Sequence, residues 1–311
     1  MEHRILGLHH ITAIAGDAKR NLDFYTTVLG LRLVKKTVNF DDPGTYHFYY
    51  GDETGTPGSI LTFFPWADIG QGSTGTGMAT GIGYSVPDAS LDFWKERFSR
   101  LGVKHGEAGQ RFGEQYLPFQ DPDGLNLELI IPGKKDSRKP WETGEVHADV
   151  ATKGFHSVTL TLRRITPTAT ILTDVLGYSL LNQEGNRYRF ITNAIETASI
   201  IDLVEAPNGG TGRGAAGTNH HVAFRVSDET ILMEFREKVA RKGLSITPKI
   251  DRDYFFSLYF REPGGVLFEL ATDNPGFARD EPVDQLGTNL KLPKQYEAAR
   301  AEIEKILPVL S

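Results

Sequence analysis

Four segments of the chain open with the same kind of short strand, at intervals of about 70 residues. They begin at His10, Gly81, His156 and His221. Three of the four alternate apolar and polar residues, as a half-buried strand does. The spacing predicts one supersecondary unit that is copied four times along the chain.

A helix is predicted after each of these strands. In the first module Asp17 can cap a helix whose apolar residues recur at helical spacing, and Gly30 ends it. The third module repeats this ending. The second and fourth modules share a longer helix, over residues 90–98 and 231–239, that stops at a Leu-Gly or Lys-Gly pair.

The second and fourth modules end on nearly the same sequence, an acid-Pro-x-Gly turn followed by a strand that carries a glutamate. The turns begin at Asp121 and Glu262, and the glutamates are Glu128 and Glu269. Each module therefore has the order β-α-β-β-β. We expect an α+β fold in which four βαβββ modules form two cup-shaped domains of mixed β-sheet with helices outside.

A Lys-, Pro- and Gly-containing segment over residues 133–153 separates the second module from the third. We expect a first domain over residues 1–132 with modules one and two, and a second over 154–274 with modules three and four. Residues 275–311 are expected to form a C-terminal extension that is partly helical.

Composition removes several classes of function. The chain has no cysteine, which excludes disulfides, zinc–thiolate sites, iron–sulfur clusters and cysteine nucleophiles. Its net charge is -6 and its basic residues are scattered, so no nucleic-acid partner is expected. Because no apolar stretch approaches the roughly 18 residues of a membrane span and no signal peptide is evident, we expect a cytoplasmic protein without a membrane partner. The sequence is compatible with a homo-oligomer.

A metal site in this chain must use His, Asp, Glu, Tyr or amide oxygens. The candidates at repeated positions are His10, His156 and His221 at strand starts, and Glu128, Glu269 and a third-module acid, Asp202 or Glu205. Not every module can contribute a ligand of each kind. The second module has Gly81 where a histidine would stand, and the first has Phe63 or Phe64 where the acid would stand.

His221 and Glu269 lie in one module and are assigned first. The second histidine is His10 or His156. We prefer His10 because it and His221 are each preceded by another histidine, which can orient the ligand or point to the other face of the strand. On this interpretation His156 is a core histidine or one that supports other groups. The predicted metal ligands are His10, His221 and Glu269.

This choice has a consequence for the sheets. With His10 as a ligand, the first module pairs with the fourth across one sheet, and the second module pairs with the third. The second cup then contains Gly81, His156 and Glu128 and lacks one histidine. We expect it to be empty and structural, with Glu128 a buried, hydrogen-bonded acid.

Three more polar side chains are placed near the predicted ligands. Tyr259 lies on the strand before Glu269, where a phenol could hydrogen-bond a substrate oxygen or move its proton. Arg252 could hold an oxyanion or pair with a carboxylate. Thr12 follows His10 on the same face of its strand. Alternatively, Tyr259 is a tyrosine of the core and Arg252 forms an ion pair at the surface.

Two histidines and one carboxylate on one face of a sheet leave open positions on a metal ion for a substrate and for O₂. This ligand set suits non-haem Fe(II), and Mn(II) less often. The sequence therefore favours a mononuclear metalloenzyme.

Three segments of the first module resemble a known family. Gly-Leu-His-His-Ile-Thr over residues 7–12, together with residues 24–43 and 46–52, resembles the vicinal oxygen chelate superfamily, and within it the ring-cleaving dioxygenases that open hydroquinones. The resemblance extends over all four modules. It implies O₂ and a small hydroquinone-like or catechol-like aromatic diol as reactants. It also implies Fe(II) on His10, His221 and Glu269, supporting roles for His9, Thr12, His220 and Arg252, and a Tyr259 that faces the substrate.

Two other functions fit the same pattern. The first is a glyoxalase-type isomerase or thiol transferase, which uses a divalent metal as a Lewis acid and usually needs a second glutamate as a fourth ligand. The Phe63 or Phe64 position argues against it. The second is a metal-free binding protein for an aromatic drug or quinone, in which His10 and His221 would not be ligands.

Overall fold

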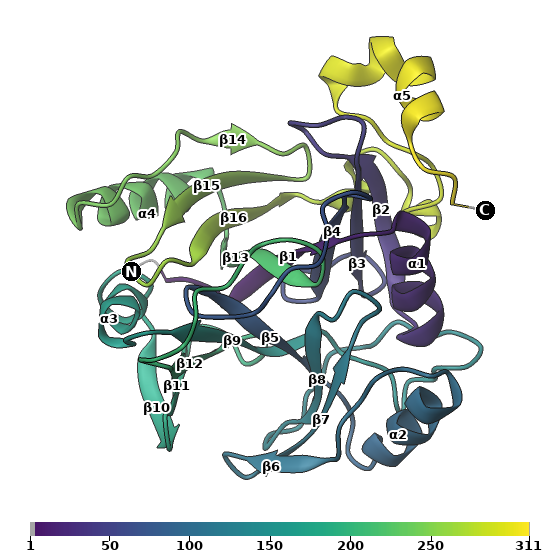
Figure 1. Cartoon of the computed structure of the whole chain (residues 1–311). Coiled ribbons are helices and arrows are strands. Elements are labelled where there is room, and N and C mark those ends of the chain that lie inside the picture. The colour runs from purple at the N-terminus through teal and green to yellow at the C-terminus, as the bar shows by residue number, and fades with distance from the viewer. Residues whose placement is uncertain (1–3, 311) are drawn as a thin grey trace.

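In the computed structural model, which describes residues 4–310, the strands form two mixed sheets of eight strands each (Figure 1). In order across the first sheet they are β14 (Ile250–Asp251), β15 (Phe255–Arg261), β16 (Leu267–Pro275), β13 (Thr218–Val226), β1 (Leu8–Ala15), β4 (Ile60–Pro65), β3 (Tyr46–Gly51) and β2 (Arg32–Val38). Across the second sheet they are β10 (Ser179–Glu184), β11 (Arg187–Ile191), β12 (Ile200–Glu205), β9 (Phe155–Leu162), β5 (Met78–Ser85), β8 (Asn126–Ile131), β7 (Glu114–Gln120) and β6 (Gly109–Arg111).

Each sheet joins one module from each half of the chain. In the first sheet β1 of module one pairs with β13 of module four in antiparallel fashion. In the second sheet β5 of module two pairs with β9 of module three in the same way. The module pairing predicted from His10 is therefore confirmed. The sheets cross the division drawn at residues 133–153, a segment that contains neither helix nor strand.

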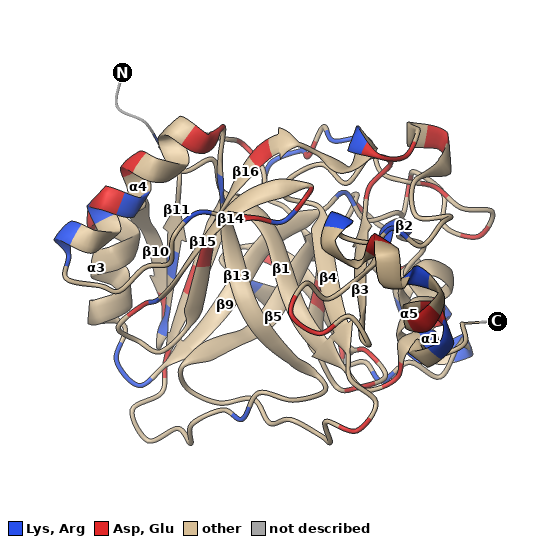
Figure 2. Ribbon diagram, turned by 90° about the horizontal axis from the view of Figure 1, so that it is seen from above, with Lys and Arg blue, Asp and Glu red and all other residues tan. Residues whose placement is uncertain are grey.

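The four predicted module helices are present and lie outside the sheets, with charged residues concentrated on helices and loops (Figure 2). They are α1 (Ala18–Asp23), α2 (Leu91–Arg100), α3 (Thr166–Asp174) and α4 (Glu229–Arg241). Asp17 caps α1 as predicted, because its side chain accepts a hydrogen bond from Arg20 N at 2.7 Å. The helix continues as a wider turn over Phe24–Val28 and ends at Gly30, whose φ of 67° suits glycine.

The C-terminal extension is partly helical. Three short 3₁₀ segments, Phe277–Arg279, Val283–Gln285 and Lys294–Ala299, precede the helix α5 (Arg300–Ile306). Figure 1 shows α5 outside the sheets, beyond β2. Among the helices of residues 4–310, none has both the length and the apolar character that crossing a membrane requires.

The central strands of the first sheet have one face toward the helices and the other toward the concave side of the sheet. Every residue of β1 is buried, including His9, His10 and Thr12. Side chains of a strand alternate between faces, so one face of β1 packs into the apolar core and the other points into the cup. The polar residues on β1 therefore sit deep inside the protein, where they need partners.

Candidate metal centre

The predicted ligands stand on three neighbouring strands of the first sheet. Glu269 on β16 pairs with Ala223 on β13, which in turn pairs with His10 on β1. His221 precedes Ala223 by two positions and so shares its face of the strand. Ala223 at the middle of this row has only a methyl group, which leaves room for the three larger side chains to converge.

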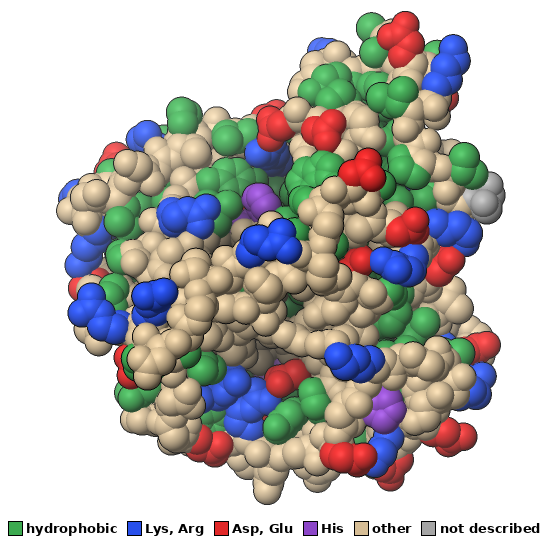
Figure 3. Space-filling view, viewed as in Figure 1, with side chains coloured by type: hydrophobic (Ala, Val, Ile, Leu, Met, Phe, Trp, Pro, Cys, Tyr) green, Lys and Arg blue, Asp and Glu red, His purple; other side chains and the backbone are tan. Residues whose placement is uncertain are grey.

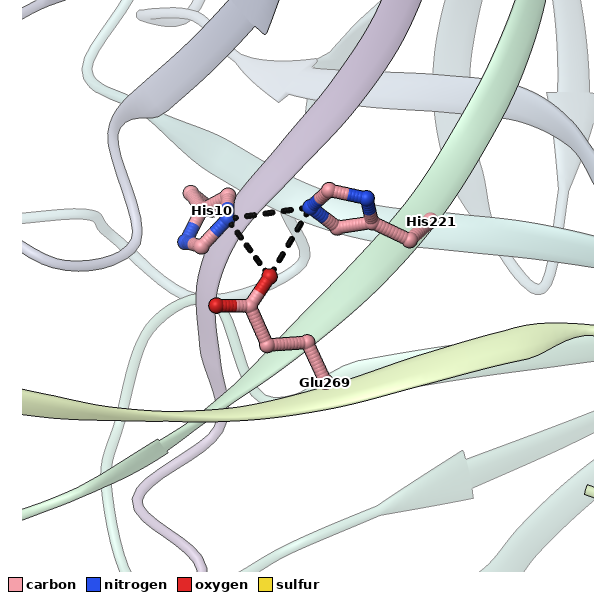
Figure 4. A group of neighbouring side chains, drawn as sticks. All are labelled: His10, His221 and Glu269. Carbon is pink, nitrogen blue, oxygen red and sulfur yellow. Dashed lines mark hydrogen bonds and ion pairs between the residues drawn. The ribbon is translucent and has the colours of Figure 1, made fainter. Parts of the chain in front are cut away.

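The three side chains meet at one point (Figure 4). Oε2 of Glu269 lies 3.1 Å from His10 Nε2 and 2.8 Å from His221 Nε2. The two Nε2 atoms are 3.3 Å apart. Ligands at right angles on a metal ion, with bonds of about 2.1 Å, are about 3 Å from one another. The spacing thus matches three adjacent positions around one ion.

The hydrogen bonds behind His10 determine which of its ring nitrogens faces the other two side chains. His9 Nε2 lies 3.1 Å from the carbonyl oxygen of Thr272, which can only accept, so this nitrogen carries the proton. Burial holds the pKa of His9 well below its usual value, so the ring is neutral and its Nδ1 is an acceptor. His10 Nδ1 lies 2.9 Å from that acceptor and donates to it. In its neutral form His10 then presents a bare lone pair on Nε2.

His221 is arranged in a similar way. The Nδ1 atom of His221 lies 2.7 Å from Nδ1 of His220. Burial lowers the pKa of His221. Burial opposes ionisation of Glu269, but the adjacent His10 and His221 outweigh burial and hold the pKa of Glu269 well below its usual range. When both rings are neutral and carry their protons on Nδ1, two imidazole lone pairs and a carboxylate oxygen converge in a buried place. Three such acceptors are stabilised together by a cation.

The other oxygen of Glu269 is held by a residue that the sequence reasoning missed. Ser257 on β15 donates its hydroxyl to Oε1 of Glu269, and both side chains are fully buried. This bond fixes the carboxylate so that Oε2 faces the two histidines. Among residues 4–310, His10, His221 and Glu269 are the one group of at least three His, Cys, Asp or Glu residues that could hold a metal ion.

A cavity of about 360 Å³ opens beside the three side chains. Its polar lining includes Thr12, His47 and Arg252. Its walls are mostly aromatic: Phe40, Tyr49, Phe64, Trp66, Phe255 and Tyr259. Cavities of this size with mainly apolar walls and a few polar groups are typical of small-molecule sites.

Tyr259 extends the row of ligands by one strand, because it pairs with Glu269 across β15 and β16. Its ring lies 5.6 Å from that of His221. Burial raises the pKa of the Tyr259 phenol, so the hydroxyl keeps its proton at neutral pH. The Arg252 guanidinium lies 5.4 Å from the centre of the Tyr259 ring and 3.7 Å from Asp41. Both predicted residues therefore face the cavity.

On the opposite wall a chain of hydrogen bonds leads to Thr12. The Tyr49 hydroxyl lies 2.9 Å from His47 Nδ1, and His47 Nε2 lies 2.9 Å from the Thr62 hydroxyl. Thr62 in turn lies 2.9 Å from the Thr12 hydroxyl. Only Thr12 of this chain was predicted. The other members could have been found from the alternation of polar and apolar residues on the strands of module one, which places them on the same face as Thr12.

The register corrects one expectation about module one. In module four, Glu269 pairs with the residue two positions after His221. The corresponding residue of module one, two positions after His10, is Thr12, and it pairs with Thr62. Thr62, and not Phe63 or Phe64, therefore occupies the position of the acid. The inference that module one supplies no second glutamate is unaffected.

The second cup contains ion pairs in place of the three converging acceptors. Arg111 holds Glu128 with two hydrogen bonds, of 2.7 and 3.1 Å. Glu128 is therefore a hydrogen-bonded acid, as predicted, but its side chain is 19% exposed and not buried as expected. His156 Nε2 lies 3.0 Å from a carboxylate oxygen of Glu114. The Arg189 guanidinium lies between two acids, 2.5 Å from Glu114 and 2.8 Å from Asp202.

His156 is one residue away from the ligand position of its module. Asp202 pairs with Thr159, and the residue two positions earlier on that strand is Ser157. His156 therefore corresponds in sequence to His220, the first histidine of its doublet, while Ser157 corresponds to His221. The other third-module candidate, Glu205, accepts a hydrogen bond from Ile165 N at 3.2 Å. Neither His156 nor Glu205 belongs to the group that His10, His221 and Glu269 form in the first cup.

The fold is that of one superfamily. The chain belongs to the Glyoxalase/Bleomycin resistance protein/Dioxygenase superfamily, whose model matches residues 7–129 and 154–270.

Relatives within the superfamily cover nearly the whole chain. The "Putative ring-cleaving dioxygenase MhqO" of Bacillus subtilis is 46% identical over 99% of this chain and 98% of its own. The chlorohydroquinone/hydroquinone 1,2-dioxygenase of Sphingobium indicum is 35% identical over 97% of this chain and 96% of its own. A crystal structure of a Bacillus subtilis relative, 44% identical, superposes with a TM-score of 0.95 over 100% of this chain and 99% of that one. Glyoxalase I of Zea mays shares the fold, with 18% identity and a TM-score of 0.63 over 88% of this chain and 93% of that one.

Proposed function

We propose that this protein is a ring-cleaving dioxygenase that opens a small aromatic diol, hydroquinone-like or catechol-like, with O₂ at a non-haem Fe(II) site. The observation that carries the proposal is the convergence of His10 Nε2, His221 Nε2 and Glu269 Oε2 within 3.3 Å of one another beside an aromatic cavity. The names of the Bacillus and Sphingobium relatives support the reaction class. Mn(II) would fit the same ligands.

The donor set suits a metal with open positions. His10, His221 and Glu269 would hold an ion through two imidazoles and one carboxylate, and would leave it room for further ligands from the cavity. When bound there, Fe(II) would bring the diol and O₂ together and pass electrons from the ring to oxygen. The position equivalent to a second glutamate is Thr62, a neutral side chain, which favours this function over a glyoxalase-type isomerase.

The chain's own residues hold the diol and control its protons. The aromatic walls bury the ring and exclude water, while the polar groups at the cavity floor fix its orientation. Because burial keeps the Tyr259 phenol protonated, its hydroxyl can donate a hydrogen bond to a substrate oxygen. The Arg252 guanidinium beside it favours the deprotonated form of a diol hydroxyl.

On the other wall the hydroxyl of Thr12 and the imidazole of His47 also face the cavity. The Thr62 hydroxyl connects them, at 2.9 Å from each. Burial holds the pKa of His47 well below its usual value, so this ring is neutral and can accept a proton at one nitrogen while it donates at the other. We assign these groups to proton transfer at the substrate. His9 and His220 act through the ligands, whose ring orientation they fix.

Oxygen uptake by the Fe(II)-loaded protein, with ascorbate and a panel of hydroquinones and catechols, tests this function. We expect at least one diol to consume O₂, and the rate to vanish in His10→Ala together with the bound iron. His156→Ala is the matched control, since it removes a buried histidine from the second cup and should keep the iron. If no diol consumes O₂, the dioxygenase function is wrong. If His156→Ala loses the iron and His10→Ala keeps it, the site lies elsewhere.

A further inference from the structure

A second cavity, of about 620 Å³, adjoins the candidate metal centre. It shares His220, His221 and Leu267 with the aromatic cavity. The rest of its lining comes from both sheets and from loops beside them, including residues 76–79, 211–212 and 263–266. The two cavities therefore lie on either side of His220, His221 and Leu267.

The charge of this second cavity is opposite to that of the chain. Arg163, Arg164 and Arg261 line it, and its lining contains no Asp or Glu, although the whole chain has a net charge of -6. In Figure 3, two histidines are visible at this face, and several Lys and Arg side chains lie beside the upper one, with Asp and Glu side chains above it. The cavity therefore favours an anion.

The hydrogen bonds of these arginines leave most of their donors available. Arg261 Nη1 donates to the carbonyl of Gly265 at 2.6 Å, and Arg163 Nη2 donates to the Thr211 hydroxyl at 3.4 Å. Both acceptors are neutral. The neighbouring acid Glu262 is buried and accepts hydrogen bonds from Gly264 N and Val266 N of its own turn and from the Thr168 hydroxyl of α3, and none of these donors is an arginine.

The proposed reaction creates an anion. Cleavage between the hydroxylated carbon and its CH neighbour turns the first carbon into a carboxyl group and the second into an aldehyde. Both atoms of O₂ enter the product and O₂ accepts four electrons from the ring, so no other reductant takes part. The carboxyl group loses its proton at neutral pH. A neutral diol enters the aromatic cavity and a carboxylate has to leave.

We propose that the arginine-lined cavity binds the carboxylate of the ring-opened product and guides it away from the metal centre, an inference that rests on the proposed function. Arg261 is its principal contact, since it is the last residue of β15, the strand that carries Tyr259. An arginine can bind a carboxylate through two parallel hydrogen bonds, which a lysine cannot.

Calorimetric titration of the Fe(II)-loaded protein with cis,cis-muconate, an open-chain unsaturated dicarboxylate, tests the site without O₂ or diol. We expect Arg261→Gln to weaken binding about 5- to 10-fold, Arg261→Lys to weaken it less, and the double variant Arg163→Gln/Arg164→Gln to weaken it comparably. Arg100→Gln, which removes an exposed arginine on α2, should bind as the wild type does. Higher salt should weaken wild-type binding.

A second measurement identifies the source of the carboxylate. The ratio of kcat/KM for 2,5-dihydroxybenzoate to that for hydroquinone is compared between wild type and Arg261→Gln. An unchanged ratio, with weaker muconate binding, supports a product site. A ratio that falls in Arg261→Gln assigns the arginines to a carboxylate on the substrate and overturns the proposal. Equal muconate binding in wild type and Arg261→Gln overturns it as well. If muconate binds as expected but no diol consumes O₂, the anion site stands and the proposed function fails.

Discussion

Replacement of His9 tests whether the hydrogen bonds behind the ligands determine metal affinity. His9→Leu removes the acceptor for His10 Nδ1 and the donor to the Thr272 carbonyl, which lie 2.9 and 3.1 Å from the His9 ring nitrogens. His10 is then free to turn or to adopt the tautomer that carries its proton on Nε2, where it would oppose a metal ion. His9→Gln keeps an amide that can both donate and accept.

Two independent magnitudes give the size of this effect. A buried donor or acceptor that loses its partner costs about 1–3 kcal/mol. Loss of a residue that orients a metal ligand typically weakens metal binding about 10- to 100-fold, which corresponds to about 1.4–2.7 kcal/mol. We therefore expect His9→Leu to bind Fe(II) about 10- to 100-fold more weakly, and His9→Gln to recover most of the affinity.

Competition with a coloured chelator under anaerobic conditions measures this affinity. The control is His156→Leu, which removes a buried histidine that bonds to Glu114 in the second cup and should leave Fe(II) binding unchanged. Circular dichroism confirms that each variant is folded. Wild-type affinity in His9→Leu, or equal losses in His9→Leu and His9→Gln, would refute the reasoning about the tautomer.

Three further variants test other parts of the account. Tyr259→Phe should lower kcat for O₂ uptake about 100-fold or more while iron content stays at the wild-type level, and a wild-type rate would exclude proton donation by the phenol. Ala223→Leu should abolish iron binding, because its larger side chain fills the space where the ligands meet, whereas Ala223→Gly should retain it; bound iron in Ala223→Leu would place the site elsewhere. Burial opposes ionisation of Glu114, but His156 and Arg189 lower its pKa to about 2 from 4.5, so its contribution to stability is present above pH 4.5 and is lost as the pH falls toward 2. Glu114→Gln should cost about 2–3 kcal/mol in urea unfolding at pH 7 and should flatten the loss below pH 4.5; an unchanged acid profile would contradict this.

The repeat in the sequence was enough to predict the modules and their helices. Asp17 and Gly30 are local signals, since a cap and a left-handed glycine act on the residues next to them, and both have the predicted roles. The pairing of module one with module four followed from the choice of His10, because two ligands of one ion must lie close together and both start strands. The structure brings His10, His221 and Glu269 together as that choice required.

The errors concern register and neighbours across strands. A shift of one residue moves a side chain to the other face of a strand, so treating His156 as the equivalent of His221 misplaced it. Alignment of Val158 with Val222 would have shown that Ser157 holds that position. The same one-residue error assigned Phe63 or Phe64 to the place of Thr62.

Ser257 and His47 were missed for a different reason. Each hydrogen-bonds a partner on an adjacent strand, Glu269 for Ser257 and Thr62 for His47. Neither contact is visible in the sequence until strand order and register are known, because the spacing of the residues along the chain does not fix them.

Anomalous X-ray diffraction from crystals of the Fe(II)-loaded protein, measured on both sides of the iron absorption edge, tests the central claim most directly. We predict one strong peak per chain, at bonding distance from His10 Nε2, His221 Nε2 and a carboxylate oxygen of Glu269. A peak in the second cup beside His156 and Glu128, or a protein that takes up no stoichiometric iron, would contradict it.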